Sequence, residues 1–97
     1  MSEILGIRFL VVDDEESIRR LCVTVANGLG FTCMEASNGQ AALSLLEEQP
    51  AHIILTDLVM PQMSGLEFLD RVRKMLPRAE VAVMTGHGSV ETAVQAM

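Results

Sequence analysis

Residues 9–14 read FLVVDD, four apolar residues that stop abruptly at Asp13 and Asp14. A continuous apolar run of this length, without polar alternation, is typical of a parallel strand buried on both faces. Two later runs end in the same manner, IILTD at 53–57 in an aspartate and VAVMT at 81–85 in a threonine. Because the carboxyl ends of neighbouring parallel strands converge on one crevice, we expect these polar groups to share a pocket.

The stretches between these runs have the apolar spacing of helices. Together they predict an α/β fold with a doubly wound parallel sheet in one domain, without internal repeats or linkers. The predicted strands are 8–12, 31–36, 52–56 and 79–84, and the predicted helices are 17–29, 38–49, 66–76 and 89–97. The second strand, shorter and more mixed in composition, is predicted to be less buried than the first.

Each predicted helix has an apolar stripe that we expect to lie on the sheet. In the first helix, Arg19 and Arg20 fall on the opposite, solvent side. Asn38 is suited to cap the second helix, and Pro77 stops the third. The expected stripes are Ile18, Leu21, Cys22, Val25, Ala26 and Leu29 in the first helix, Ala42, Leu43 and Leu46 in the second, and Leu66, Leu69, Val72 and Leu76 in the third.

The composition excludes several classes of function. The net charge of −6 and the single lysine argue against direct binding of nucleic acid, whose phosphates are bound by clustered basic residues. Cys22 and Cys33 are too few for a disulfide scaffold and are expected to stay reduced. With no signal peptide and no apolar run long enough to cross a membrane, we expect a cytoplasmic protein without membrane contact.

The three aspartates have the chemistry of a site for a divalent cation and a phosphoryl group. Mg²⁺ takes carboxylate oxygens together with waters and phosphate oxygens, and Asp13, Asp14 and Asp57 can supply such ligands. Asp57 stands alone at the end of a rigid apolar strand, which makes it the candidate nucleophile for an acyl phosphate. The hydroxyl of Thr85 is placed to donate to a phosphoryl oxygen.

A simpler interpretation treats these residues as ordinary turn chemistry. Asp14 or Ser17 could cap the following helix, a lone aspartate after a strand is common, and Thr85 beside Gly86 could be part of a turn. Each signal is weak alone, and their joint position at three strand ends favours a functional site.

Three segments give the chain a family resemblance: VVDDEESIRRL at 11–21, ILTDLVMPQMSGLEFL at 54–69 and VMTGHGSVETAVQAM at 83–97. In order and interval they resemble the receiver domain of two-component response regulators, over essentially the whole chain. The third segment is similar to receivers of NtrC-type transcriptional activators. The resemblance implies a flavodoxin-like or CheY-like sheet in which a (βα)₅ fold is truncated to about (βα)₄, with strand order 2-1-3-4.

The resemblance also implies roles for particular residues. Asp57 would be the phosphoacceptor for a histidine kinase, and Asp13, Asp14 and the backbone carbonyl of Val59 would join it in holding Mg²⁺. Thr85 would sense the phosphate and switch an output domain. Such a domain is a signalling phosphoacceptor that assists its own phosphotransfer and dephosphorylation, rather than an enzyme.

The family carries a lysine followed by proline at the end of a fifth strand, and residues 1–97 end before that strand would begin. We therefore expect an incomplete receiver domain, without the fifth strand and fifth helix, and an ATPase or DNA-binding output domain beyond Met97. Lys74 is a poor substitute, because its place in the third helix suggests a solvated face. The strand at 79–84 would be an exposed edge of the sheet. We therefore also expect that two copies of the chain could form a homodimer through this edge.

Two enzyme classes fail on specific residues. A haloacid-dehalogenase phosphatase needs a second aspartate two positions after the nucleophile, where this chain has Val59. A dinucleotide-binding domain needs glycines after the first strand, where this chain has acidic residues that would repel a pyrophosphate. The alternative that stays open is a receiver-like interaction module that works without phosphorylation.

Overall fold

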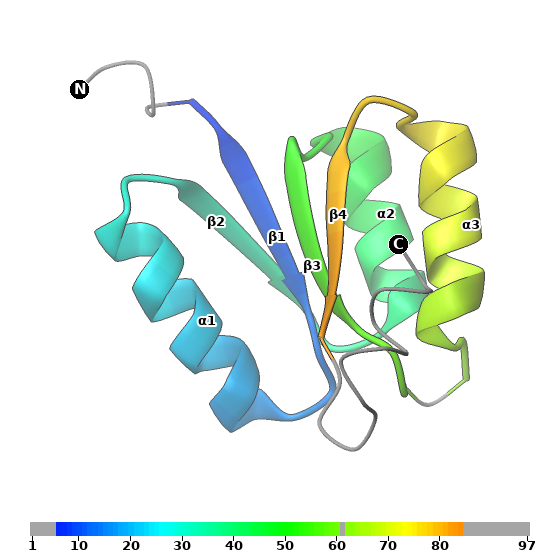
Figure 1. The fold of residues 1–97 in the computed structure, drawn as a ribbon, viewed down its shortest axis with the longest axis horizontal. Coiled ribbons are helices and arrows are strands. Elements are labelled where there is room, and N and C mark those ends of the chain that lie inside the picture. Colours follow the sequence, from blue (N-terminus) through cyan, green and yellow to red (C-terminus); the bar gives the residue numbers. More distant parts are fainter. Residues whose placement is uncertain (1–5, 61, 85–97) are drawn as a thin grey trace.

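The computed structural model of the chain describes residues 6–60 and 62–84, which form a parallel sheet with helices on both faces (Figure 1). The strands lie in the order β2-β1-β3-β4, and each neighbouring pair is parallel. This confirms the predicted fold class and strand order. The helix predicted at 89–97 lies outside the described residues. The elements are β1 (Arg8–Val12), α1 (Glu16–Gly28), β2 (Thr32–Ala36), α2 (Gly39–Glu48), β3 (Ile53–Asp57), α3 (Gly65–Met75) and β4 (Glu80–Met84).

Local hydrogen bonds explain where the helices begin and end. The side chain of Asn38 accepts from the Ala41 amide at 2.8 Å, which confirms the predicted cap of α2, and Ser64 caps α3 in the same manner. α1 ends at Gly28, and Gly30, two residues later, has a φ of 97° that suits glycine and allows the closing bonds of a Schellman motif. The start of α1 differs from the simpler interpretation above. Its N-cap position is Glu15 and no side chain caps it, so neither Asp14 nor Ser17 has that role.

One face of the sheet, which we call the α2/α3 face, holds the main core. Leu10, Val12 and Ile54 point from the strands into this core and are completely buried. The stripe predicted for α2 is confirmed, and α3 differs by one position: Phe68 is buried whereas Leu66 is 55% exposed. Phe68 lies on the same face of α3 as Val72, one helical turn later, and its aromatic ring therefore packs in the core. The helical side chains of this core include Ala42, Leu43, Leu46, Phe68 and Val72.

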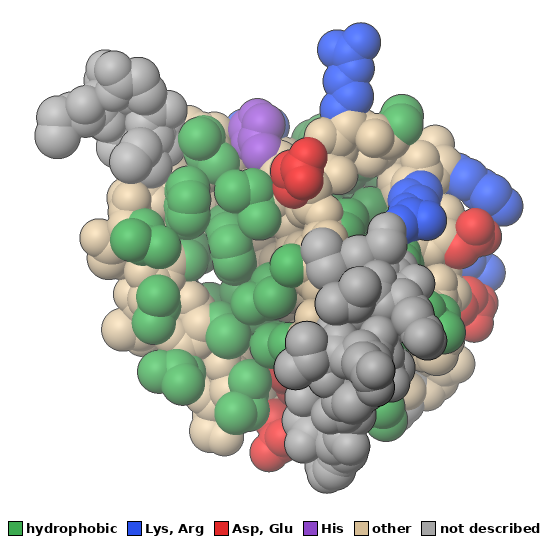
Figure 2. Space-filling view, viewed as in Figure 1, with side chains coloured by type: hydrophobic (Ala, Val, Ile, Leu, Met, Phe, Trp, Pro, Cys, Tyr) green, Lys and Arg blue, Asp and Glu red, His purple; other side chains and the backbone are tan. Residues whose placement is uncertain are grey.

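The opposite face, which we call the α1 face, is covered less completely. α1 was predicted to place its apolar stripe on the sheet, and this is largely wrong: Leu21, Val25 and Leu29 are each more than half exposed. The less exposed stripe is displaced by about one position and consists of Arg19, Cys22, Val23 and Ala26, at the same helical spacing. Hydrophobic side chains therefore gather on this surface, over α1 and the neighbouring strands (Figure 2).

The two edges of the sheet are β2 and β4 in the described part of the chain. The prediction that β2 is less buried than β1 is confirmed, since β1 ends in three buried residues and β2 in one. Within residues 6–60 and 62–84, no helix is long and apolar enough to cross a membrane.

Candidate metal and phosphoacceptor site

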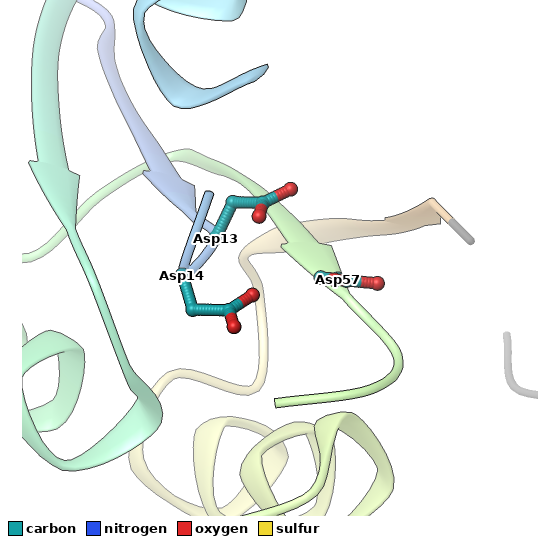
Figure 3. A group of neighbouring side chains, drawn as sticks. All are labelled: Asp13, Asp14 and Asp57. Atoms are coloured by element: carbon teal, nitrogen blue, oxygen red, sulfur yellow. The ribbon is translucent and has the colours of Figure 1, made fainter. Parts of the chain in front are cut away.

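Parallel register brings the three predicted aspartates together. In the pairing of β1 with β3, Val12 lies opposite Thr56. Asp13 and Asp57, which follow these two residues, therefore lie at the same edge of the sheet. One carboxylate oxygen from each of Asp13, Asp14 and Asp57 lies within 4.8 Å of the others. Figure 3 shows the three side chains arranged around one space at the carboxyl ends of the strands.

Asp13 is the most rigidly held of the three. The residue is 3% exposed. Its amide donates to the carbonyl of Ala36 at 3.1 Å, and this bond connects Asp13 to the end of β2. Its Oδ1 accepts from the Glu15 amide at 2.8 Å. That bond turns the chain sharply after β1 and directs Asp14 toward the same space.

The electrostatics of the site favour a cation. Burial raises the pKa of Asp13, the hydrogen bond from the Glu15 amide lowers it, and the negative charges of Asp57 and Asp14 raise it further. The pKa therefore lies above its ordinary value, which means that the folded protein disfavours the ionised carboxylate. A divalent cation between the carboxylates would remove this penalty more effectively than a single proton at neutral pH.

Asp57 is the last residue of β3 and is partly exposed at the crevice. Its backbone is fixed on both sides, because the Thr56 hydroxyl donates to the Asp57 carbonyl at 3.1 Å and the Leu58 amide donates to the carbonyl of Met84 at 3.0 Å. The Val59 amide donates to Oδ1 of Asp57 at 3.3 Å. One carboxylate oxygen is thus oriented by the chain, and the carboxylate remains accessible from the crevice.

Gly65 allows α3 to begin directly against this backbone. Its amide donates to the carbonyl of Leu58 at 2.8 Å. A Cβ at this position would press on the carbonyl oxygen of Asp57 and lie 2.6 Å from the Cα of Leu58. Glycine is therefore required here by close approach, and it sets the position of the strand end that carries Asp57.

Three carboxylates at the ends of paired strands, one of them buried beside two like charges, fit the oxygen ligand set that Mg²⁺ prefers. The backbone carbonyl of Val59 stays a prediction as a fourth ligand, since the described contact of Val59 is made by its amide. Thr85, predicted to sense the phosphate, lies outside the described residues.

Comparison with known proteins identifies the family. The sequence profile of the response regulator receiver domain matches residues 9–97. The chain belongs to the response regulator receiver family. This confirms the resemblance and makes the protein a signalling module of two-component systems.

Receivers similar to this one come from transcription regulators. The chain is 39% identical over 90 residues to the regulatory protein AtoC of Escherichia coli K12, covering 93% of this chain and 20% of AtoC. It is 36% identical over 86 residues to the DNA-binding transcriptional regulator NtrC of Salmonella typhimurium, covering 89% of this chain and 18% of NtrC. The chain thus spans about a fifth of these relatives.

Among solved structures, the beryllofluoride-activated NtrC4 receiver domain dimer superposes on this receiver with a TM-score of 0.83. The two are 38% identical, and the match covers 92% of this chain and 74% of that one.

Sequence reasoning missed one residue next to this cluster. Arg19 was assigned to the solvent side of its helix, whereas its side chain is 16% exposed and donates to the carbonyl of Asp13 at 2.9 Å. A signal was present in the sequence, because Arg19 lies three, four and seven positions before Cys22, Val23 and Ala26 and therefore shares their helix face. The larger apolar residues on the adjacent stripe concealed it.

Proposed function

We propose that this receiver accepts a phosphoryl group on Asp57 from a partner histidine kinase, with Mg²⁺ held by Asp13, Asp14 and Asp57. The observation that carries the proposal is the convergence of the three carboxylates within 4.8 Å at the carboxyl ends of two paired strands. The family assignment supports a role in two-component signalling. A cytoplasmic location is part of the proposal, because the phosphodonor is generated there.

The proposed step is a displacement at phosphorus. A carboxylate oxygen of Asp57 attacks the phosphorus atom and forms a new O–P bond, while the bond between phosphorus and the histidine nitrogen breaks. The leaving nitrogen keeps the bonding electron pair, and the product is an acyl phosphate on Asp57. Asp57 is suited to this attack because its backbone is fixed and the Val59 amide orients its Oδ1.

Mg²⁺, when bound, would neutralise charge on the phosphoryl oxygens. Asp13 and Asp14 would contribute by supplying carboxylate ligands for the cation beside the nucleophile, and the rigid Asp13 turn keeps this arrangement before the donor arrives. We assign the hydroxyl of Thr85, which follows β4 in the sequence, to the phosphoryl oxygens, where a hydrogen bond would report phosphorylation. The backbone carbonyl of Val59 is the proposed fourth ligand.

The proposal extends to partners outside this domain. AtoC and NtrC are regulatory proteins about five times as long as the matched region, which supports an output domain of the ATPase or DNA-binding kind in the protein containing this receiver. The NtrC4 receiver was solved as a dimer. We propose that this chain can also pair with a second copy through β4, which is an edge strand of the sheet within the described residues.

Phosphorylation with a small donor tests the central proposal. Incubation of the full-length protein with Mg²⁺ and acetyl phosphate is expected to add one phosphoryl group, detected as a mass increase that is labile at alkaline pH. Asp57→Asn should abolish it. The matched control is Asp70→Asn, which removes an exposed carboxylate paired with Lys74 on α3 and should leave labelling unchanged.

Label that persists in Asp57→Asn, or labelling that is unaffected by chelation of divalent cations, would contradict the proposed site. Wild-type protein that takes no label while a partner still binds it would favour the interaction module that works without phosphorylation. The proposed dimer is checked separately by solution mass, and a cooperatively folded monomer at all concentrations would rule it out.

A further inference from the structure

Arg19 connects the end of β2 to the turn that carries the acidic cluster. Its Nε lies 2.8 Å from Oε1 of Glu35 on β2, and its Nη1 donates to the backbone carbonyl of Asp13 at 2.9 Å. The side chain of Arg19 is 16% exposed and so is largely shielded from water. Arg19 therefore joins the turn after β1 to the end of β2 with hydrogen bonds from one planar group.

These bonds complete the restraint of Asp13. The Asp13 amide is held by Ala36, its carboxylate by the Glu15 amide, and its carbonyl by Arg19. Without the Arg19 contact, the carbonyl of this residue would lose a charge-assisted bond in a place that is almost completely buried. The peptide between Asp13 and Asp14 could then rotate, and the two carboxylates would lose their fixed separation.

The charge of Arg19 is directed away from the cluster. Within the described contacts, the guanidinium meets Asp13 at the backbone carbonyl, and the carboxylate that pairs with it is Glu35. The guanidinium pairs with Glu35, which also lies 3.3 Å from Nη1 of Arg20. Arg19 thus contacts the backbone of a candidate ligand while its positive charge is balanced on β2, so the carboxylates stay available for a cation.

We propose that Arg19 is a positioning residue of the metal site, which acts through the Asp13 carbonyl and is itself held by Glu35. This inference rests on the proposed function, because it assumes that the three aspartates bind Mg²⁺. Residues that orient metal ligands without touching the metal commonly change metal affinity by about 10- to 100-fold when they are replaced.

The sign of the effect separates positioning from simple charge. A positive group near a cation site repels the cation, so a charge effect alone predicts that Arg19→Gln binds Mg²⁺ more tightly. Positioning predicts weaker binding, because the turn that presents Asp13 and Asp14 loses its anchor. We expect the dissociation constant for Mg²⁺ to rise about 10-fold in Arg19→Gln.

The test measures Mg²⁺ affinity of the full-length protein by calorimetric titration, with thermal unfolding in chelator recorded alongside. The matched control is Arg20→Gln, since Arg20 also pairs with Glu35 but is 64% exposed in its side chain and has no described contact with Asp13. We expect its Mg²⁺ affinity to stay within about twofold of wild type. A second readout without metal is hydrogen exchange at the Glu15 amide, which should accelerate in Arg19→Gln and not in Arg20→Gln.

Glu35→Gln tests the anchor and serves as the second variant if Arg19→Gln does not fold. It should also weaken Mg²⁺ binding, and the double variant should bind no more weakly than Arg19→Gln alone, because both changes break one chain of contacts. Unchanged or tighter binding in Arg19→Gln, or additive losses in the double variant, would overturn the inference. Wild-type protein without Mg²⁺ affinity would instead overturn the proposed function itself.

Discussion

The two faces of the sheet are built from the same strands and differ in how they are covered. On the α2/α3 face, strand residues such as Leu10 and Ile54 and helix residues such as Leu46 are almost completely buried. On the α1 face, Ile53 and Leu55 are only partly buried, and Leu21 of α1 is 60% exposed. Alternation along a strand assigns each side chain to a face, but the packing helices decide how much of that face is removed from water.

This difference shows why α1 was predicted less accurately than α2. α2 has small and large apolar residues on one stripe, and burying that stripe closes the core. α1 has two adjacent stripes that are both suitable, and the one nearer the sheet contains Arg19, which forms hydrogen bonds with Glu35 and the carbonyl of Asp13. A long polar side chain whose donors have partners can therefore occupy the sheet side of a helix while larger aliphatic side chains stay exposed.

The largest expected effect is on the closed face. Leu46→Ala removes a side chain that is 1% exposed in the main core and should lower the free energy of unfolding by about 3–5 kcal/mol. Chemical denaturation at equilibrium measures the loss. A loss below about 1 kcal/mol would mean that this core can collapse around the gap, and the contrast between the faces would weaken.

The next effect concerns the attachment of α3 to the strand end. Gly65→Ala places a Cβ against the Asp57 carbonyl and the Leu58 backbone, so we expect a loss of about 1–3 kcal/mol together with slower labelling of Asp57. Gly28→Ala is the matched control, because a Cβ there has no atom within 4 Å. Denaturation and acetyl phosphate labelling would measure both. Normal stability and labelling in Gly65→Ala would show that α3 can shift freely.

A gain in stability, rather than a loss, is expected from a substitution in the acidic cluster at the carboxyl ends of the strands. Asp13→Asn keeps an acceptor for the Glu15 amide and removes a buried charge, so it should stabilise the cation-free protein by about 0.5–2 kcal/mol at neutral pH. Because the folded-state pKa of Asp13 is raised, its ionised form costs stability above that pKa.

The gain in Asp13→Asn should therefore shrink as the pH falls through the raised pKa and should vanish below the ordinary pKa of aspartate. Mg²⁺ should raise the unfolding temperature of the wild type and not of the variant. Thermal unfolding across pH, in chelator and in Mg²⁺, measures both. A variant less stable than wild type in chelator would contradict the strained acidic cluster.

The smallest effect is expected on the open face. Leu21→Ala repeats the chemistry of Leu46→Ala at a side chain that is 60% exposed, and alanine is the better helix former, so the change should stay within about 0.5 kcal/mol. The same denaturation measurement applies. A loss approaching that of Leu46→Ala would show that this surface of α1 is covered in solution, and the comparison of the two faces would fail.

The sequence by itself determined the α/β class, the element order and the three aspartates, because apolar runs and strand-end residues are local signals. The structure decided what depends on distant segments meeting. Register between β1 and β3 brought Asp13 beside Asp57, close approach at Gly65 fixed the backbone of this candidate nucleophile, and the rotation of α1 placed Arg19 against Asp13. Helical periodicity gives the positions that share a face, whereas contacts between elements determine which face turns inward.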